Sequence, residues 1–339
     1  MKFLIAGLGS IGRRHLRNLL ALGEDDILLY RTGRSTLPDD ELAQFPVETD
    51  LGAALAHKPD AVIVSNPTSL HLEVAIPAAE AGCHLLVEKP ISHTMAGIDE
   101  LQAAVAHGGG QVLVGYQFRF HPGLQQTSRL LAENAIGRPL SVRAHWGEYL
   151  PDWHPWEDYR QGYSARIDLG GGVILTLSHP LDYLRWLFGN VEACWAFAGQ
   201  LNDLGLGVED TVEIGLRFTN GTLGSLHLDY NQRPPSHWLE VIGTNGTLRW
   251  DNKDGVVRLY QAGKPLPSKK ETWTVYPPDS QSEGRPFERN DMFLAEMAHF
   301  RDLILGNSKS TCSLTDGIET MRLALGIHDS SRQARLIEF

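Results

Sequence analysis

The sequence predicts an α/β fold in two parts: a doubly wound parallel sheet, then a larger and mostly antiparallel sheet with its own helices. At the N-terminus a short apolar run leads directly into glycines and a helical pattern. Similar apolar runs alternate with amphipathic segments up to about residue 120. Beyond about residue 141, apolar residues recur at every second position. We therefore expect one domain over 1–121 and a second over 122–339.

Composition narrows the class of protein. The 339 residues are 42% hydrophobic and 21% charged, values typical of a soluble globular protein. A formal charge of −11, with no long run of like charges, disfavours nucleic acid or an anionic membrane as the main partner. No apolar run reaches the length of a membrane span, and the N-terminus does not resemble a signal peptide.

The cysteines indicate a reducing compartment. Cys83, Cys194 and Cys312 are far apart and form no CxxC pair, so we expect reduced core thiols in a cytoplasmic protein and no metal site. His154, His179 and Asp182 offer metal-ligand chemistry, but no HExxH motif or carboxylate pair supports a site.

The first element carries the strongest single motif. Residues 2–6 form an apolar strand, and GLGSIG at 7–12 follows before a helical pattern. Gly7 permits the tight turn, Gly9 lets the backbone approach a pyrophosphate, and Gly12 lets the helix pack on the strand. The alternative is a structural glycine turn. Strand, glycines and helix in this order favour a dinucleotide site, whose candidate residues are Gly7, Gly9, Ser10, Ile11 and Gly12.

The second strand, over 27–30, indicates which dinucleotide is bound. It ends in YRTGRS, without the carboxylate that would bind the ribose hydroxyls of NAD. Arg31, Thr32 and Arg34 suit a 2′-phosphate, so we expect NADP(H) to be preferred, with NAD(H) possible. Solvated loop arginines are the alternative interpretation.

Further strands are predicted over 61–65, 84–87 and 112–115, and polar residues follow each of them. The carboxyl ends of parallel strands meet at one edge, where ligands bind. Lys89 could polarise a substrate oxygen or take part in proton transfer there, unless it only pairs with Glu88 at the surface. The cofactor-binding candidates at these ends are Asn66, Pro67, His71, Glu88, Lys89 and Gln117.

The stretch 168–187 is the main candidate for the catalytic segment. Three glycines at 170–172 precede an apolar series at helical spacing. Thr176, His179 and Tyr183 lie on the opposite face of the predicted helix, and Asp182 is next to that face. Pro180 requires either a kinked helix or a new helix capped by Ser178. We expect His179 to be catalytic rather than a buried histidine bonded to backbone.

An aromatic segment at 149–166 precedes the glycines. Its mixture of tryptophan, tyrosine, histidine and arginine is typical of a loop that covers a sugar, although packing at an interface is an alternative. The substrate-binding candidates are Lys89, Arg119, Trp153, His154, Tyr163, Arg166, Thr176 and His179.

The remaining segments predict the second sheet. Alternating strands are expected around 142–146, 193–197, 212–218 and 226–230, with Asn-Gly turns at 220–221 and 245–246. Two core-facing helices are expected from Phe293 and from Ile318, the second capped at Thr315 or Asp316.

Six motifs in order resemble the Gfo/Idh/MocA oxidoreductases: GLGSIG at 7–12, NPTSLH at 66–71, EKP at 88–90, GYQFRFHP at 115–122, GGG at 170–172, and TDGIETMRLALGIHDS at 315–330. The resemblance implies an N-terminal Rossmann domain and a C-terminal domain whose open sheet forms a dimer or tetramer. It also implies a cis peptide before Pro90 and hydride transfer between nicotinamide and a hydroxyl of a sugar, cyclitol or polyol. The aromatic segment resembles members of surface-polysaccharide or nonulosonate pathways, which implies an amino sugar or sugar nucleotide.

The resemblance assigns catalysis to Lys89 and His179, together with an Asp three or four residues before the histidine. Leu175 and Thr176 stand at those positions, so Asp182 is the best remaining carboxylate. The missing Asp keeps two alternatives open: a cofactor-binding regulator without chemistry, and a hydrolase or epimerase with transient redox.

Overall fold

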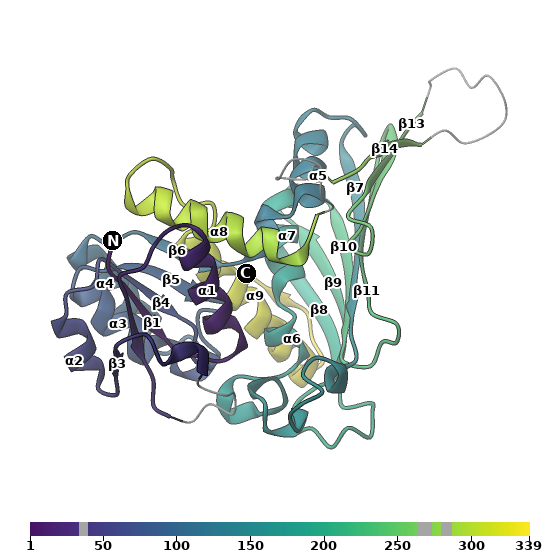
Figure 1. The fold of residues 1–339 in the computed structure, drawn as a ribbon. Coiled ribbons are helices and arrows are strands. Elements are labelled where there is room, and N and C mark those ends of the chain that lie inside the picture. The colour runs from purple at the N-terminus through teal and green to yellow at the C-terminus, as the bar shows by residue number, and fades with distance from the viewer. Residues whose placement is uncertain (34–39, 263–272, 279–286) are drawn as a thin grey trace. The chain divides into compact units, whose positions relative to one another are not determined.

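The computed structural model describes residues 1–33, 40–262, 273–278 and 287–339 (Figure 1). Contacts divide the chain into two compact units. The first unit contains 1–117, 167–171 and 292–322, and the second contains 118–166, 172–291 and 323–339. Each unit is therefore assembled from three separate segments, whereas the expected division was a single cut after residue 121.

The first unit is built on a parallel sheet, and its strands pair in register along their whole length. β1 and β4 are completely buried because helices cover both faces of such a sheet. The predicted strands 27–30 and 112–115 are confirmed to the residue. In sheet order the strands are β3 (Val47–Glu48), β2 (Ile27–Tyr30), β1 (Phe3–Ala6), β4 (Ala61–Val64), β5 (His84–Glu88) and β6 (Val112–Gly115).

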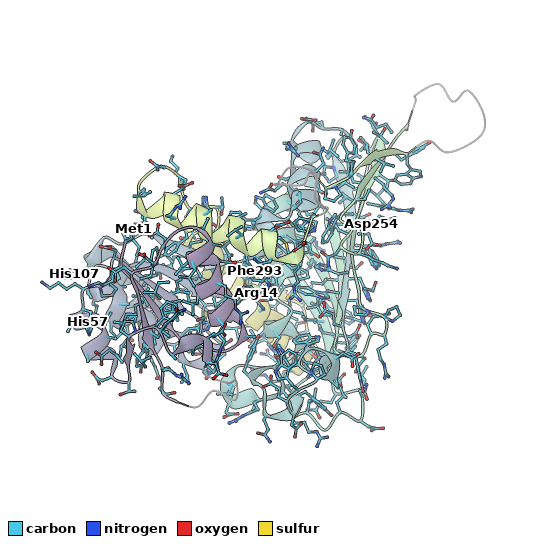
Figure 2. All side chains as sticks on the ribbon, viewed as in Figure 1. Met1, Arg14, His57, His107, Asp254 and Phe293 are labelled. Atoms are coloured by element: carbon cyan, nitrogen blue, oxygen red, sulfur yellow. The ribbon has the colours of Figure 1, made fainter. Side chains whose placement is uncertain are left out.

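Helices follow the strands of this sheet, and α3 packs on both β4 and β5. The late segment 292–322 brings most of α8 and the start of α9 into the same unit. There the guanidinium of Arg14 lies 4.5 Å above the ring of Phe293 (Figure 2). The helices are α1 (Ser10–Ala21), α2 (Leu51–Ala56), α3 (His71–Glu80), α4 (Ile98–Gly108), α8 (Arg289–Ile304) and α9 (Leu314–Gln333), with 3₁₀ turns η1 (Asp40–Leu42), η2 (Thr68–Leu70) and η7 (Ile167–Leu169).

The two late helices confirm the predicted core faces, but the predicted cap of α9 is wrong. Phe293 and Met297 of α8 are buried, as are Ile318 and Met321 of α9. The Ser313 hydroxyl accepts the amide of Asp316 at 3.2 Å, and the Asp316 carboxylate accepts the amide of Ser313 at 2.9 Å. This reciprocal arrangement is a capping box that starts at Ser313, two positions before Thr315 and three before Asp316.

The second unit is built on a larger sheet in which only the β7–β10 pair among the described strands is parallel. The predicted Asn-Gly turns at 220–221 and 245–246 join β9 to β10 and β11 to β12. In sheet order the strands are β14 (Thr274–Tyr276), β13 (Val257–Gln261), β12 (Gly246–Asp251), β11 (Ser236–Gly243), β7 (Pro139–Gly147), β10 (Leu223–Asp229), β9 (Thr211–Phe218), β8 (Val191–Gly199) and β15 (Ile337–Glu338).

One face of this sheet is covered by helices. α6 contacts β9 and β10, and α7 contacts β7. Val142, Ala144 and Trp146 of β7 point to this covered face and are buried. The helices are α5 (Pro122–Ala132), α6 (Val173–Thr176) and α7 (His179–Phe188), with 3₁₀ turns η3 (Gln117–Phe120), η4 (Leu150–Asp152), η5 (Tyr159–Gln161) and η6 (Tyr163–Ala165).

We expected the alternating apolar residues of β8, over 193–197, to share one face of the sheet. They do not. The pairing with β9 shifts register between Val191 and Ala193. Cys194 and Ala196 are consequently buried, whereas Trp195 and Phe197 lie on the other face with 36% and 60% of their surface exposed. The largest side chains of this strand therefore do not belong to the core.

The cysteines are buried thiols, as predicted, and burial raises the pKa of Cys83 to about 11 and of Cys194 to about 12. None of the described helices is long and apolar enough to cross a bilayer. The peptide bond between Lys89 and Pro90 is cis, which confirms that expectation.

Candidate functional site: a glycine loop and a histidine helix

The turn after β1 shows why three of its positions are glycine. Gly7 has φ of +93°, and a Cβ there would lie 2.5 Å from the Asn66 amide nitrogen. A Cβ on Gly12 would lie 1.9 Å from the Gly7 carbonyl oxygen, so this helix position also excludes a side chain. Gly9 differs, because a Cβ there would meet no described atom within 4 Å. It stands at the N-cap of α1, where free amides favour an anion, and Ser10 beside it is exposed.

The loop after β2 presents Arg31 and Thr32, and the Arg31 amide donates to the Glu48 carbonyl at 3.1 Å. Arg34, the third residue expected to bind a 2′-phosphate, lies outside the described residues. From residue 30 to residue 33 there is no carboxylate.

A carboxylate that sequence reasoning missed lies in the next turn. Glu41 of η1 binds Arg13 at 2.9 Å and Arg17 at 2.7 Å, both from α1. Partial burial opposes ionisation, but these two guanidiniums hold the pKa of Glu41 below its usual value. Spacing along α1 alone does not reveal a partner 28 residues away.

The end of β4 is tied to the end of β5 by one histidine. The ring of His71 is 1% exposed, and its Nδ1 lies 3.0 Å from the Pro90 carbonyl oxygen. Its Nε2 lies 2.9 Å from the Asn66 carbonyl oxygen, and the Asn66 side chain donates to the Leu70 carbonyl. Both ring nitrogens of His71 therefore face backbone carbonyl oxygens, and the neutral ring donates from one of them at a time.

Glu88, which ends β5, is buried and does not form the surface pair that we considered. Its Oε1 lies 2.7 Å from His15 Nε2, and its Oε2 accepts the Lys89 amide at 3.2 Å. Burial opposes ionisation of Glu88, but His15 and Lys89 lower its pKa. Lys89 itself is half-buried, and Gln117 is buried at the last position of the first unit's main segment.

A second buried acid lies in this unit. Glu296 of α8 is completely buried, and neither of its carboxyl oxygens has a hydrogen-bond partner among the described residues. Burial raises the pKa of Glu296 well above its usual value, and the charge of Glu88 adds to that shift. Burial therefore favours the neutral form of Glu296 in the folded protein.

In the second unit, the glycine-rich stretch leads into two short helices rather than one. α6 ends at Thr176 and α7 begins at His179, with Ser178 at its N-cap position and Pro180 in its first turn. This confirms a new helix with Pro180 in its first turn, but the Ser178 side chain makes no capping hydrogen bond to it. Gly172, with φ of +105°, leaves room for the Glu209 carboxylate, whose Oε1 would lie 2.4 Å from a Cβ. The close approach permitted by this glycine is thus by the chain's own side chain.

His179 lies in an aromatic wall at the start of α7. Its ring is 2% exposed, 5.0 Å from the ring of Phe118 and 5.6 Å from that of Trp146. Trp146 also stacks on His237 at 4.3 Å. Burial lowers the pKa of His237 well below its usual value, so this second ring is a neutral core residue.

Asp182 and Arg119, which we assigned separately to catalysis and to substrate, bind each other. Arg119 Nε donates to Asp182 Oδ2 at 2.9 Å and a terminal nitrogen donates to Oδ1 at 2.7 Å. The side chains are 4% and 1% exposed, so this two-bond ion pair is buried. It joins η3 to the first turn of α7, on which His179 stands.

Thr176 occupies the position where the resemblance leads us to expect a carboxylate. It is buried and lies beside Tyr230, whose hydroxyl donates to the Ser164 carbonyl at 3.3 Å. A carboxylate that we missed, Glu209, accepts the Ile174 amide at 3.1 Å. Burial raises the pKa of Glu209, against the opposing effects of His328 and this amide.

The aromatic segment folds as a succession of 3₁₀ turns, η4 to η6. Trp153 packs edge-on to Tyr230 at 5.5 Å, and His154 lies 5.1 Å from Trp156. Tyr163 and Arg166 are exposed. Part of the segment therefore packs on its own unit, and part is presented to solvent.

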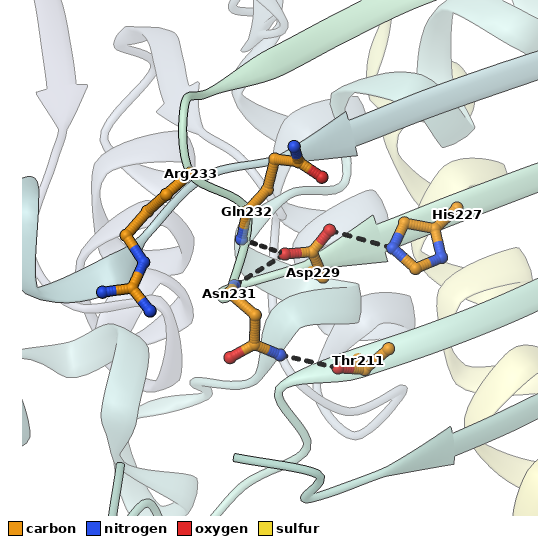
Figure 3. Close-up of a pocket in the computed structure, with 6 residues that line it drawn as sticks. All are labelled: Thr211, His227, Asp229, Asn231, Gln232 and Arg233. Atoms are coloured by element: carbon orange, nitrogen blue, oxygen red, sulfur yellow. Dashed lines mark hydrogen bonds and ion pairs between the residues drawn. The ribbon is translucent and has the colours of Figure 1, made fainter. Parts of the chain in front are cut away.

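The face of the second unit's sheet that the helices leave uncovered carries an open polar pocket of about 350 Å³ (Figure 3). His227 bridges Glu213 at 2.6 Å and Asp229 at 2.9 Å, and these bonds raise its pKa. The lining residues are Thr211, His227, Asp229, Asn231, Gln232 and Arg233. None of them was predicted as a site residue. The described residues contain no cluster of His, Cys, Asp or Glu suited to a metal ion.

Family models match both parts of the chain. A model described as an oxidoreductase family with an NAD-binding Rossmann fold covers residues 1–116, and a GFO/IDH/MocA C-terminal domain covers 124–249. The chain belongs to the GFO/IDH/MocA oxidoreductase family.

Relatives within this GFO/IDH/MocA family include enzymes acting on sugars and polyols. The 1,5-anhydro-D-fructose reductase of Ensifer adhaerens is 28% identical over 79% of this chain and 76% of its own. The myo-inositol 2-dehydrogenase of Thermotoga maritima is 29% identical over 74% and 75%. A structure of levoglucosan dehydrogenase in complex with NADH has the same fold, with a TM-score of 0.88, 19% identity and coverage of 100% and 98%.

Proposed function

We propose that this GFO/IDH/MocA protein is a dehydrogenase or reductase of a sugar-type substrate, in which hydride passes between nicotinamide and a hydroxyl-bearing carbon. The glycine loop is the observation that carries the proposal. Gly9 leaves open space at the N-terminus of α1, which fits the pyrophosphate of a dinucleotide. The substrates named for the two relatives support a sugar or polyol. The aromatic segment at 149–166 extends the proposal to amino sugars and sugar nucleotides.

The cofactor would be held by the loop at 7–12 and by residues after β2, β4 and β5, and would accept or supply the hydride. His179 would take the proton from the substrate hydroxyl during oxidation and return it during reduction. Lys89 would stabilise the negative charge that develops on the substrate oxygen. Asp182 would act as a positioning residue, because its bonds to Arg119 fix the turn that carries His179.

A panel of sugars, polyols and sugar nucleotides, followed by nicotinamide absorbance, tests the proposal. We expect substrate-dependent turnover that falls by about 10²- to 10⁴-fold in His179→Ala, the range for loss of a general acid or base. His107→Ala is the matched control, since His107 is an exposed histidine near the end of α4. Cofactor binding without turnover on any substrate would contradict an enzymatic role.

The preferred cofactor is proposed to be NADP(H). Arg31 and Thr32, with Arg34, offer donors for a 2′-phosphate, and residues 30–33 contain no carboxylate to bind ribose hydroxyls. Titration by nicotinamide fluorescence should give tighter binding of NADPH than of NADH, and Arg31→Ala together with Arg34→Ala should abolish the difference. Tighter NADH binding by the unaltered protein would instead support NAD(H), the cofactor named for the levoglucosan dehydrogenase complex.

Thr176 favours a second candidate, a cofactor-binding protein without turnover. A hydroxyl beside Tyr230 stands where the resemblance leads us to expect the catalytic carboxylate. Thr176→Asp distinguishes the two candidates. If the natural protein is inactive and Thr176→Asp gains sugar-dependent turnover, the regulatory function holds. If the natural protein is already active, catalysis does not need a carboxylate at position 176.

The exposed face of the second unit's sheet is proposed to join two copies of the chain. Trp195 and Phe197 pack edge-on at 4.1 Å and remain 36% and 60% exposed, an apolar pair typical of interfaces. Light scattering should show a dimer or tetramer that Phe197→Glu dissociates. Leu201→Glu, at a residue 76% exposed outside the strands, is the control. A natural protein that is monomeric would contradict the proposal.

The compartment is proposed to be cytoplasmic, on the ground that all three cysteines are buried thiols.

A further inference from the structure

The backbone that carries Lys89 is held by buried side chains on both sides. Before it, Glu88 Oε2 accepts the Lys89 amide at 3.2 Å. After it, His71 Nδ1 lies 3.0 Å from the Pro90 carbonyl oxygen and 3.2 Å from that of Ile91. The peptide units next to Lys89 are thus bonded to side chains of other positions.

His71 makes this attachment from a different loop. It is the first residue of α3, and its Nε2 lies 2.9 Å from the Asn66 carbonyl oxygen, in the turn after β4. One ring therefore links the turn after β4 to the turn after β5. The His71 ring is 1% exposed, and both of its nitrogens face backbone oxygens of its own unit. The ring is therefore not available to bind a cofactor directly.

We propose that His71 is a positioning residue for Lys89, acting through the Pro90 and Ile91 carbonyls, rather than a direct ligand of the cofactor. The inference rests on the role proposed above for Lys89. A lysine ammonium stands at the end of four methylenes, so its position depends on a fixed backbone, and a displacement of about 1 Å can cost about 10²-fold in rate.

The charged groups around His71 are compatible with this role. Burial lowers the pKa of His71, while the Glu88 carboxylate and the three carbonyl oxygens act in the opposite direction. Glu88 is itself paired with His15 and bonded to the Lys89 amide. His71 and Glu88 thus belong to one buried network around the lysine.

The test uses His71→Leu, which fills the volume without a donor, and His71→Asn, which keeps one amide donor. We expect kcat to fall about 10- to 100-fold in His71→Leu and less in His71→Asn, with KM and NAD(P)H affinity changed less than about threefold. In a Lys89→Ala background the same substitution should have no further effect, because positioning an absent ammonium changes nothing. Loss confined to cofactor affinity, or an equal loss in both backgrounds, would overturn the proposal.

A second readout does not depend on turnover. The rate at which acetic anhydride modifies the Lys89 amine, measured by mass spectrometry in the intact protein, should change severalfold in His71→Leu and be closer to natural in His71→Asn. His84→Leu is the matched control, since His84 begins β5 at the opposite end from Lys89 and also contacts backbone, at the Gln111 amide. If no sugar is turned over, the proposed function fails, but an unchanged Lys89 rate in both His71 variants is what refutes the positioning role.

Discussion

The Arg119–Asp182 pair shows how burial changes the role expected for a residue. Both side chains carry chemistry that sequence reasoning assigned to substrate and catalysis, yet each meets the other at 2.7–2.9 Å with almost no solvent. A buried pair gives little net stability relative to apolar residues of similar size, but removing one partner is costly because it leaves the other charge without compensation.

Asp182→Ala should therefore lower the free energy of unfolding by about 3–5 kcal/mol, as for other broken buried pairs. The double variant Arg119→Met with Asp182→Leu should cost less, because no charge is left buried. Urea unfolding followed by tryptophan fluorescence measures both. Equal stability of Asp182→Ala and the natural protein, with activity lost, would mean that the carboxylate acts in chemistry instead.

Glu296 predicts a stability that depends on pH. Its folded pKa lies above the unfolded value of 4.5, so the fold must hold a proton that the unfolded chain releases at neutral pH. This penalty grows as pH rises above 4.5. Glu296→Gln should thus stabilise the protein at pH 7.5 and do so much less at pH 4.5, because the unfolded chain keeps more of its proton at the lower pH.

Thermal unfolding at the two pH values checks this, with the exposed Glu100→Gln of α4 as control. A stability gain that is the same at both pH values would show that Glu296 is ionised in the fold.

Some candidate site residues and buried acids could be predicted from the sequence, and others could not. The loop glycines and His179 lie in short motifs that are visible in the sequence, although Asn66, Phe118 and Trp146, which pack against them, come from distant segments. Glu41, Glu209 and Glu296 depend on partners or burial set by distant segments, and no local pattern marks them.

At the scale of elements, α6 and α7 show that a single proline can predict where one helix ends and the next begins. Pro180 indicated either a kink or a new helix, and the structure has two helices with Pro180 in the first turn of the second. Strand positions were also predictable from alternation. The outward side chains of β8 were not, because a register shift depends on the partner strand.

Gly172 sets the entry into these helices and allows a test. Gly172→Ala would place a Cβ 2.4 Å from the Glu209 carboxylate at φ of +105°, so we expect a loss of about 2–4 kcal/mol from strain and displacement of the carboxylate. Gly205→Ala is the control, because Gly205 also has positive φ, +67°, but open space around it. Unfolding midpoints of the two variants that differ little would contradict the packing argument.

At the scale of the whole molecule, the first unit is not one continuous segment, because 167–171 and 292–322 also belong to it. The two sheets were predictable, because each has its own periodicity. The assignment of 292–322 to the first unit was not, since a helix pattern does not say which sheet it covers.

A fragment of residues 1–121 should accordingly fail as an independent domain. In the full chain Ser310 donates to the Val112 carbonyl at 2.8 Å, and the Val114 amide donates to the Cys312 carbonyl at 2.9 Å. Without them the edge of β6 is open and prone to association. Size-exclusion chromatography should show aggregates, and fusing residues 292–322 through a Gly-Ser linker should restore a monomer. A monomeric fragment 1–121 that binds NADH as tightly as the full chain would contradict this.

The same edge has a consequence for synthesis on the ribosome. The strand that begins the sheet emerges first, but the residues that close its last edge emerge almost two hundred positions after β6. The nascent chain must carry an incomplete sheet while residues 118–291 are made, so premature termination between β6 and residue 310 would release a product with an open strand edge. For this protein, quality control of truncated chains bears directly on solubility.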